Sequence, residues 1–323
     1  MLKQMAQSFY RSVLDEVGVP ASLSSAIQDH PALRQVVFGE KKTASSRDIQ
    51  QWENLGRSAR GLDAPQGVLV GWTDTQGSYA SIDLPVTALS RLVTTRTVEQ
   101  FTCDITEIET LGAAKSNLSE YSNLDEFAEQ RCANLLGDIS KEGLLKMLEH
   151  DQIRSVGANA TDTLSRYGWD GRLNLLNEGG AHHFAAARYI AKHMDIPVPI
   201  CTTLHEYVFD PLAVAQLNQQ FDIFAIGDPA HDARAHLALQ DAFKKVRATF
   251  FIGSLPWSAG DHARDASAIF LLKNDRKSER IADLFRKEGF MDLGQVLESK
   301  LAVQLSATKT TRVRSHQPSE LGM

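Results

Sequence analysis

The sequence predicts a mixed α/β protein, because segments typical of strands and of helices alternate along the chain. Residues 172–176 have the apolar content of a short strand, and residues 181–194 repeat apolar side chains at helical spacing. Residues 67–73 and 78–84 flank a short turn that contains glycine, a pattern typical of a β-hairpin. The run 196–204 is apolar and β-branched, and its prolines confine it to a sheet edge or to the entrance of a strand.

The remaining elements follow from the same two periodicities and from capping residues. In the N-terminal part, apolar residues recur every four positions over 2–17, which predicts an amphipathic helix. Asn123 or Ser122 caps a helix that we expect to run to residue 135, and residues 138–148 supply another. In the C-terminal part, strands are expected at 221–226, 249–255 and 268–273, and helices at 235–248 and from a Ser278 cap to Gly289.

These elements suggest three folded parts and a tail. Residues 1–100 form an N-terminal helical and hairpin region, residues 101–215 a central domain, and residues 216–305 a separate C-terminal α/β unit. Residues 306–323 are rich in Ser, Thr and Gln and have no apolar period, so we expect a mobile polar tail. The basic residues in this tail leave open a short anchor for an acidic partner.

Composition narrows the classes of protein to consider. No apolar run among the 323 residues is long enough to cross a bilayer, and the first residues lack the continuous apolar core of a secretion signal. Cys103, Cys132 and Cys201 are widely spaced and odd in number, which suits reduced structural thiols. The sequence therefore predicts a cytoplasmic protein with no membrane partner.

Charge bears on the choice of partner. The formal net charge is -6 and the isoelectric point is about 5.9, so the overall field does not favour nonspecific binding to nucleic acid. A local basic patch for nucleic acid stays open. The partner that we expect is a nucleotide or another phosphorylated small molecule, because a glycine turn precedes the helix at 181–194.

The candidate site is the junction between the strand at 172–176 and the helix at 181–194. Gly179 and Gly180 let the backbone turn tightly and approach a ligand, and the helix presents free N–H groups and the positive end of its dipole above the turn. We expect five residues to bind phosphate or another part of the ligand, namely Asn177, Glu178, Gly179, Gly180 and Ala181.

His182 and His183 are the candidate catalytic residues, as hydrogen-bond donors or as general acid and base. Their side chains leave the helix about 100° apart, so one can face the turn while the other packs, which leaves at most one of them chemically active. Asn177 and Glu178 have a second interpretation as turn or capping residues. The whole pattern also has an alternative explanation, since two glycines before an alanine-rich helix can simply pack that helix closely on a strand.

This junction resembles the ParB/sulfiredoxin-like superfamily, over about a third of the chain. The sulfiredoxin turn reads Gly-Gly-Cys-His-Arg-Tyr, and residues 179–184 read Gly-Gly-Ala-His-His-Phe. ParB-type domains carry Gly, two Arg and a pair of alanines at positions that match Gly180, His182, His183, Ala186 and Ala187. The resemblance implies a ParB/sulfiredoxin-like central domain that binds a nucleotide such as ATP or CTP with Mg²⁺ and hydrolyses it or transfers its phosphate.

The departures from the family pattern restrict these expectations. Ala181 stands in place of the reactive sulfiredoxin cysteine, which excludes cysteine sulfinate reduction here. His183 stands in place of an arginine, so phosphate affinity should be weaker or dependent on pH. A strand is expected at 221–226, where a ParB protein would continue with a helical DNA-binding domain.

Two alternatives to an enzyme of this kind stay open. The protein could be a non-catalytic ligand-binding or regulatory protein, or, as a weaker alternative, a DNA nuclease, although it lacks a clear set of metal-binding carboxylates. We expect no metal site. The His and Asp residues that invite a metal site do not share the spacing of known ligand motifs, and they are His231, Asp232, His236, Asp261, His262 and Asp265.

Overall fold

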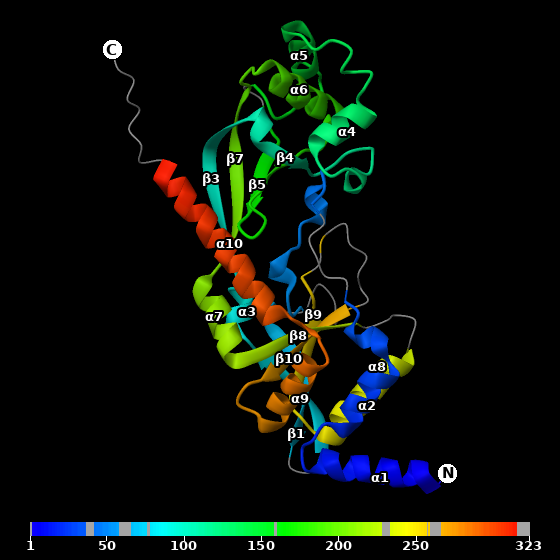
Figure 1. Ribbon diagram of the computed structural model, residues 1–323. Coiled ribbons are helices and arrows are strands. Elements are labelled where there is room, and N and C mark those ends of the chain that lie inside the picture. The colour runs from blue at the N-terminus through cyan, green and yellow to red at the C-terminus, as the bar shows by residue number, and fades with distance from the viewer. Residues whose placement is uncertain are drawn as a thin grey trace.

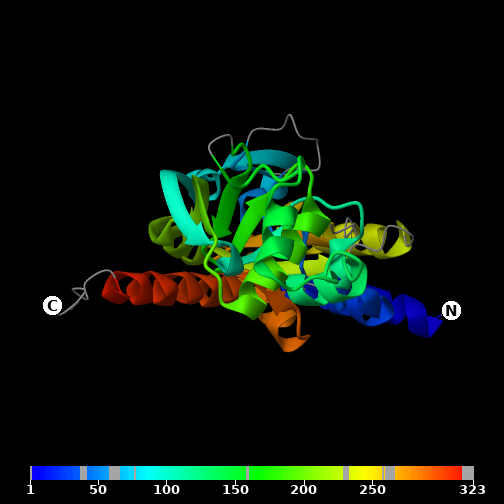
Figure 2. The same cartoon turned by 90° about the horizontal axis from the view of Figure 1, so that it is seen from above.

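The computed structural model describes residues 2–36, 42–57, 66–75, 78–157, 160–227, 233–256, 258 and 266–314. The protein has a mixed α/β fold, as the sequence predicts, and its strands form two sheets in two halves of the molecule (Figure 1). Figure 2 shows α1 and α10 extending from opposite sides. No helix in these ranges combines the length and the apolar character needed to span a membrane.

The five-stranded sheet has the order β3-β7-β5-β6-β4. Its strands are β3 (Val93–Asp104), β4 (Ile108–Leu111), β5 (Thr163–Tyr167), β6 (Leu173–Leu176) and β7 (Pro199–Phe209). Three helices pack together in this half, namely α4 (Leu124–Arg131), α5 (Lys141–Leu148) and α6 (Ala181–Met194) (Figure 1). The core between them includes the buried rings of Phe127 and Phe184.

The predicted strand, glycine turn and helix are confirmed as β6 and α6, and the strand after them as β7. β7 lies inside the sheet, between β3 and β5, and it pairs in parallel with β5. The prolines allowed either a sheet edge or the entrance of a strand. β7 begins at Pro199, so this proline lies at the strand entrance.

The six-stranded sheet has the order β11-β8-β10-β9-β1-β2, and all its neighbours are antiparallel. Its strands are β1 (Val68–Thr75), β2 (Ser78–Pro85), β8 (Phe221–Gly227), β9 (Phe250–Ser254), β10 (Ala266–Leu272) and β11 (Met291–Asp292). The helices of this half are α1 (Leu2–Glu16), α2 (Ala21–Asp29), α3 (Thr87–Ser90), α7 (Pro211–Gln220), α8 (Ala233–Val246), α9 (Arg276–Lys287) and α10 (Leu293–Arg314).

The predicted hairpin is confirmed, with Val68 opposite Pro85 and Thr75 opposite Ser78, while its turn lies outside the described residues. β1 also pairs with β9, so segments 1–100 and 216–305 share one sheet. The expected division into an N-terminal region and a separate C-terminal unit did not anticipate this pairing. Contacts between strands so distant in the chain leave no periodic signal in either segment.

Two expectations for the C-terminal part need correction. Asp275 caps α9, because its carboxylate accepts the Lys277 N–H at 3.1 Å; the expected cap, Ser278, is buried and donates to the Thr249 carbonyl at 2.5 Å. α10 continues to Arg314, so residues 306–314 of the expected tail are helical. The buried residues Leu293 and Leu297 anchor the start of that helix, and propagation then costs little.

The contact between β1 and β9 generates a prediction about stability. Gly71 pairs with Phe251, and a Cβ at Gly71 would collide with the Phe250 carbonyl oxygen. Gly71→Ala should therefore lower the free energy of unfolding by about 1–3 kcal/mol, the usual cost of overpacking. Urea denaturation followed by circular dichroism measures the change. Gly137→Ala is the control, since nothing lies within 4 Å of its added Cβ, and equal unfolding midpoints for the two variants would contradict the prediction.

Candidate functional site

The turn between β6 and α6 has the conformation that its glycines allow. Gly180 precedes α6 with a left-handed φ of 69°, and a Cβ at this position would lie 2.5 Å from the Gln152 carbonyl oxygen. Glycine alone meets both conditions without strain. No side chain caps the helix. The first N–H that bonds within the helix is that of Phe184, which donates to the Gly180 carbonyl at 2.8 Å.

A cavity of about 580 Å³ opens at this turn. Six of the seven predicted site residues line it: Glu178, Gly179, Gly180, Ala181, His182 and His183. The other lining residues come from the loop after β4, from the end of α4 and the residues after it, and from the segment after α5; they are Ala113, Ala114, Lys115, Arg131, Asn134, Leu135 and Gln152. Segments distant in the sequence thus converge on the start of α6.

Asn177, the seventh predicted residue, is buried and does not line the cavity. Its Oδ1 accepts the N–H groups of Gly112 and Ala113 at 3.1 and 3.2 Å, and its Nδ2 donates to the carbonyls of Ala113 and Gly179 at 2.8 Å. These four bonds use the amide in full. Asn177 therefore joins the loop after β4 to the glycine turn, which fits the second interpretation of this residue as a turn residue.

The cavity has a positive lining. Glu178 supplies its one carboxylate, which pairs with Arg154 at 2.9 Å. Arg131 and Lys115 have no carboxylate partner within the described parts of the chain. The N–H groups of residues 181–183 likewise have no hydrogen-bond partner in those parts. An anion in the cavity would meet two cations and the positive end of a helix.

His182 is held from two sides. Its Nε2 lies 3.2 Å from the Ser116 hydroxyl, and its ring centroid lies 5.2 Å from that of Phe127. Burial lowers the pKa of His182, and the positive charges of Arg131 and Lys115 lower it further. The imidazole is therefore neutral at pH 7, which leaves one ring nitrogen free to accept a proton.

His183 stacks on His150, with ring centroids 3.5 Å apart. Burial lowers the pKa of His183, and the neighbouring imidazoles of His150 and His182 lower it further, against the weaker pull of Asp151. The two histidines leave α6 in different directions, as expected, yet both line the cavity. Each ring also packs against a neighbouring ring, His182 against Phe127 and His183 against His150.

Sequence reasoning missed three residues of this site, namely Lys115, Ser116 and Arg131. One signal for Arg131 was present, because it follows Phe127 by four residues in a helix that was expected, so the two share a face. No local pattern marks Lys115 and Ser116, which lie in a loop.

The adjacent residues His205 and Glu206, on β7, do not line the cavity. Glu206 pairs with Arg96 and, at 3.4 Å, with Arg166. Among the described residues no group of three His, Cys, Asp or Glu side chains has the arrangement of a metal site. Five of the six residues that suggested a metal site lie outside the described residues. The sixth, His236, lies on α8, and its side chain is outside the description.

The two buried cysteines, Cys103 and Cys132, have thiols of low reactivity. Burial raises the pKa of Cys103 to about 11, with a further contribution from Glu107, and burial raises that of Cys132 to about 12. Both thiols stay protonated at neutral pH and pack in the core of the five-stranded half. Cys201 is exposed and free.

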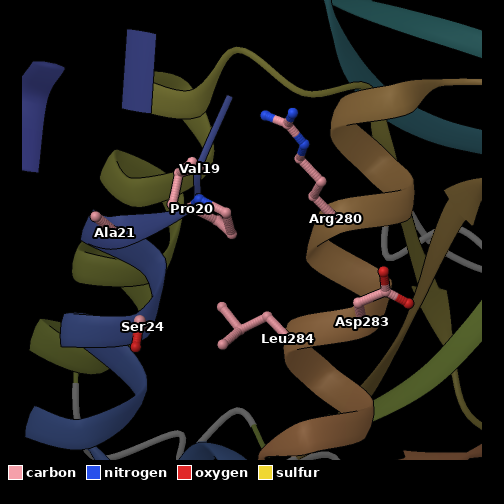
Figure 3. Close-up of a pocket in the computed structure, with 7 residues that line it drawn as sticks. All are labelled: Val19, Pro20, Ala21, Ser24, Arg280, Asp283 and Leu284. Atoms are coloured by element: carbon pink, nitrogen blue, oxygen red, sulfur yellow. The ribbon is translucent and has the colours of Figure 1, made fainter. Parts of the chain in front are cut away.

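A second hollow, of about 450 Å³, lies between α2 and α9 (Figure 3). Leu284 points across it toward α2, and Asp283 points away (Figure 3). Its only guanidinium, that of Arg280, already donates to the Val17 carbonyl at 2.7 Å. Since Arg280 is bonded to the backbone and Asp283 points away, we assign no ligand to this hollow.

Comparison with known proteins adds one match. The model of DUF6685, described as a family of unknown function, matches residues 98–310, which is more than half of the chain. No curated protein and no solved structure matches. The matched range contains every residue that lines the cavity.

The two glycines of the turn give a matched pair of variants. Gly180→Ala forces a side chain into a left-handed conformation and against the Gln152 carbonyl, so it should lower the free energy of unfolding by about 1–3 kcal/mol. Gly179→Ala should change it by less than about 1 kcal/mol, because the nearest atom to its Cβ is 3.8 Å away. Thermal and urea unfolding would measure both. A Gly180→Ala protein as stable as Gly179→Ala would contradict the described turn.

Proposed function

The chain belongs to the DUF6685 family, and we propose that it binds a nucleotide or another phosphorylated ligand in the cavity at the N-terminus of α6. One observation carries the proposal. Three free N–H groups at the start of α6 and two cations without carboxylate partners, Lys115 and Arg131, border the same cavity in the described structure. Phosphate is the common biological group that matches these donors in charge and in number of acceptors.

The two cations suit different tasks. Arg131 presents a planar fork that can bond two phosphate oxygens, while Lys115 supplies a mobile point charge. Glu178 does not cancel them, since Arg154 neutralises it at the rim. The local field is therefore positive although the whole chain has a formal charge of -6.

The cavity has room for more than a phosphate group. Its volume of about 580 Å³ falls in the range, roughly 300–1,000 Å³, typical of sites for small organic ligands. ATP and CTP are therefore the first ligands to test. Among the described residues Glu178 is the only carboxylate that lines the cavity, and it is already paired, so we derive no resident Mg²⁺ site. Mg²⁺ would arrive bound to the phosphates of the nucleotide.

The resemblance of the turn to the ParB/sulfiredoxin-like superfamily remains a prediction, and the proposal does not depend on it. A nuclease finds no support in this lining, because it offers no pair of carboxylates to hold catalytic metal ions. The choice between an enzyme and a non-catalytic regulatory protein depends on which groups surround His182.

Removing either cation should weaken phosphate binding. We expect Arg131→Gln and Lys115→Gln each to reduce the affinity for inorganic phosphate about tenfold, which corresponds to roughly 1.4 kcal/mol. Isothermal titration calorimetry at low salt measures the effect. Lys146→Gln is the matched control, because Lys146 is exposed on α5 and does not line the cavity. Unchanged affinity in both cavity variants would exclude this cavity as the phosphate site.

The histidines should make anion binding dependent on pH. Burial lowers the pKa of both His182 and His183, so each gains its positive charge only below the usual histidine value of 6.5. Sulfate, whose charge is constant over this range, should bind with the same affinity between pH 8 and about pH 7 and more tightly as the pH falls below about 6.5. The double variant His182→Asn/His183→Asn should lose this increase. A rise centred above pH 7, or one kept by the double variant, would argue against the two imidazoles.

A further inference from the structure

The hydroxyl of Ser116 sits between a cation and an imidazole. Arg131 donates its Nε–H to Ser116 Oγ at 3.4 Å, and His182 Nε2 lies 3.2 Å from the same oxygen. Both partners line the cavity, and Lys115, the residue before Ser116, lines it as well. Ser116 itself is half-buried and is not one of the lining residues, so its hydroxyl is linked to the cavity through the hydrogen-bonded side chains of Arg131 and His182.

A guanidinium can only donate, so Ser116 accepts from Arg131. Burial lowers the pKa of His182, and the charges of Arg131 and Lys115 lower it further, so the ring is neutral at pH 7. In the tautomer that carries its proton on Nδ1, Nε2 accepts the hydroxyl proton of Ser116. The order is Arg131 to Ser116 to His182, which is the arrangement of a hydroxyl with a general base within reach of its proton.

The surroundings hold this pair in place. Phe127 packs against the His182 ring, and Phe127 and Arg131 share one face of α4. On the other side of the pair, Asn177 ties residues 112 and 113 to the glycine turn. Leu118, two residues after Ser116, is buried in the core. Both ends of the short loop that carries Ser116 are therefore anchored.

We propose that Ser116 is a nucleophile, with His182 as its general base, which takes a phosphoryl group from a phosphate ester or anhydride bound in the cavity. This inference rests on the proposed phosphate binding. It makes the protein an enzyme that works through a phosphoserine intermediate.

The phosphoryl group is transferred twice, first to Ser116 and then to water. Ser116 Oγ forms a bond to phosphorus while the bond between phosphorus and the leaving oxygen breaks. The hydroxyl proton passes to His182 Nε2 and from there to the leaving oxygen. Water then loses a proton to His182 and attacks phosphorus, inorganic phosphate leaves, and Ser116 regains its proton. Lys115, Arg131 and the N–H groups of residues 181–183 stabilise the charge on the phosphoryl oxygens in both transfers.

The test uses the full-length protein and two probes, p-nitrophenyl phosphate and ATP with Mg²⁺, each quenched in acid at short times. Mass spectrometry of the peptide that contains Ser116 should find one phosphoryl group on that residue. Ser116→Ala should lose both this label and the steady release of p-nitrophenolate or ADP. His182→Asn should slow the transfer by roughly 10²–10⁴-fold, the usual contribution of general acid–base catalysis.

Ser119→Ala is the matched control, because Ser119 lies in the same loop and its hydroxyl donates to Asp48 at 2.9 Å, away from His182. It should label and turn over like the wild type. The inference is overturned if wild-type protein binds inorganic phosphate by calorimetry, yet Ser116 carries no label with either probe or Ser116→Ala keeps the turnover of Ser119→Ala. In that case the phosphate site stands without the nucleophile. Loss of phosphate binding itself would instead overturn both proposals.

Discussion

The candidate site depends on the buried side-chain amide of Asn177. Its four hydrogen bonds reach the backbone of Gly112, Ala113 and Gly179. The Gly112 N–H is shared with the Leu175 carbonyl, to which it donates at 2.8 Å, whereas both the N–H and the carbonyl of Ala113 bond to the amide. This connection brings the loop that carries Lys115 and Ser116 to the first turn of α6. It acts together with the buried Leu118 and with the bond from the Gly112 N–H to the Leu175 carbonyl, which hold the same loop against β6 and the core.

A second buried group positions the remaining wall of the cavity. Arg188 of α6 donates to the carbonyls of Ile108 and Thr106 at 2.7 and 3.2 Å, and it pairs at 2.5 Å with Asp125 in the first turn of α4. Its charge is thus neutralised and hydrogen-bonded, the condition under which a buried ion is tolerated. Since α4 also carries Phe127 and Arg131, this ion pair sets the distance between these side chains and His182. α6 therefore organises the site from its middle as well as from its N-terminus.

The sequence predicted what local patterns encode and missed what distant contacts create. The apolar period and the two glycines were enough to predict β6, the turn and α6, and they placed Gly180 and both histidines at one cavity. Asn177 was predicted to contact the ligand, because no local pattern shows that its side-chain amide would form hydrogen bonds with a loop 64 residues earlier. Ser116 could not be found, since its partners, Arg131 and His182, are 15 and 66 residues away. The pairing of β1 with β9 escaped prediction for the same reason.

Every residue that lines the cavity belongs to the half with the five-stranded sheet, yet its geometry depends on the other half as well. Gln304 of α10 is buried, and its amide bonds both the N–H and the carbonyl of Phe209, at 2.8 and 3.1 Å, at the end of β7. β7 follows α6 and lies inside the five-stranded sheet. α10 also packs on β8 and α7, so one helix connects the six-stranded sheet to the strand that follows the site. The family match over residues 98–310 includes Gln304 and leaves out β1 and β2. The part of the chain shared by the family therefore contains both the cavity and the helix that links its supporting strand to the second sheet.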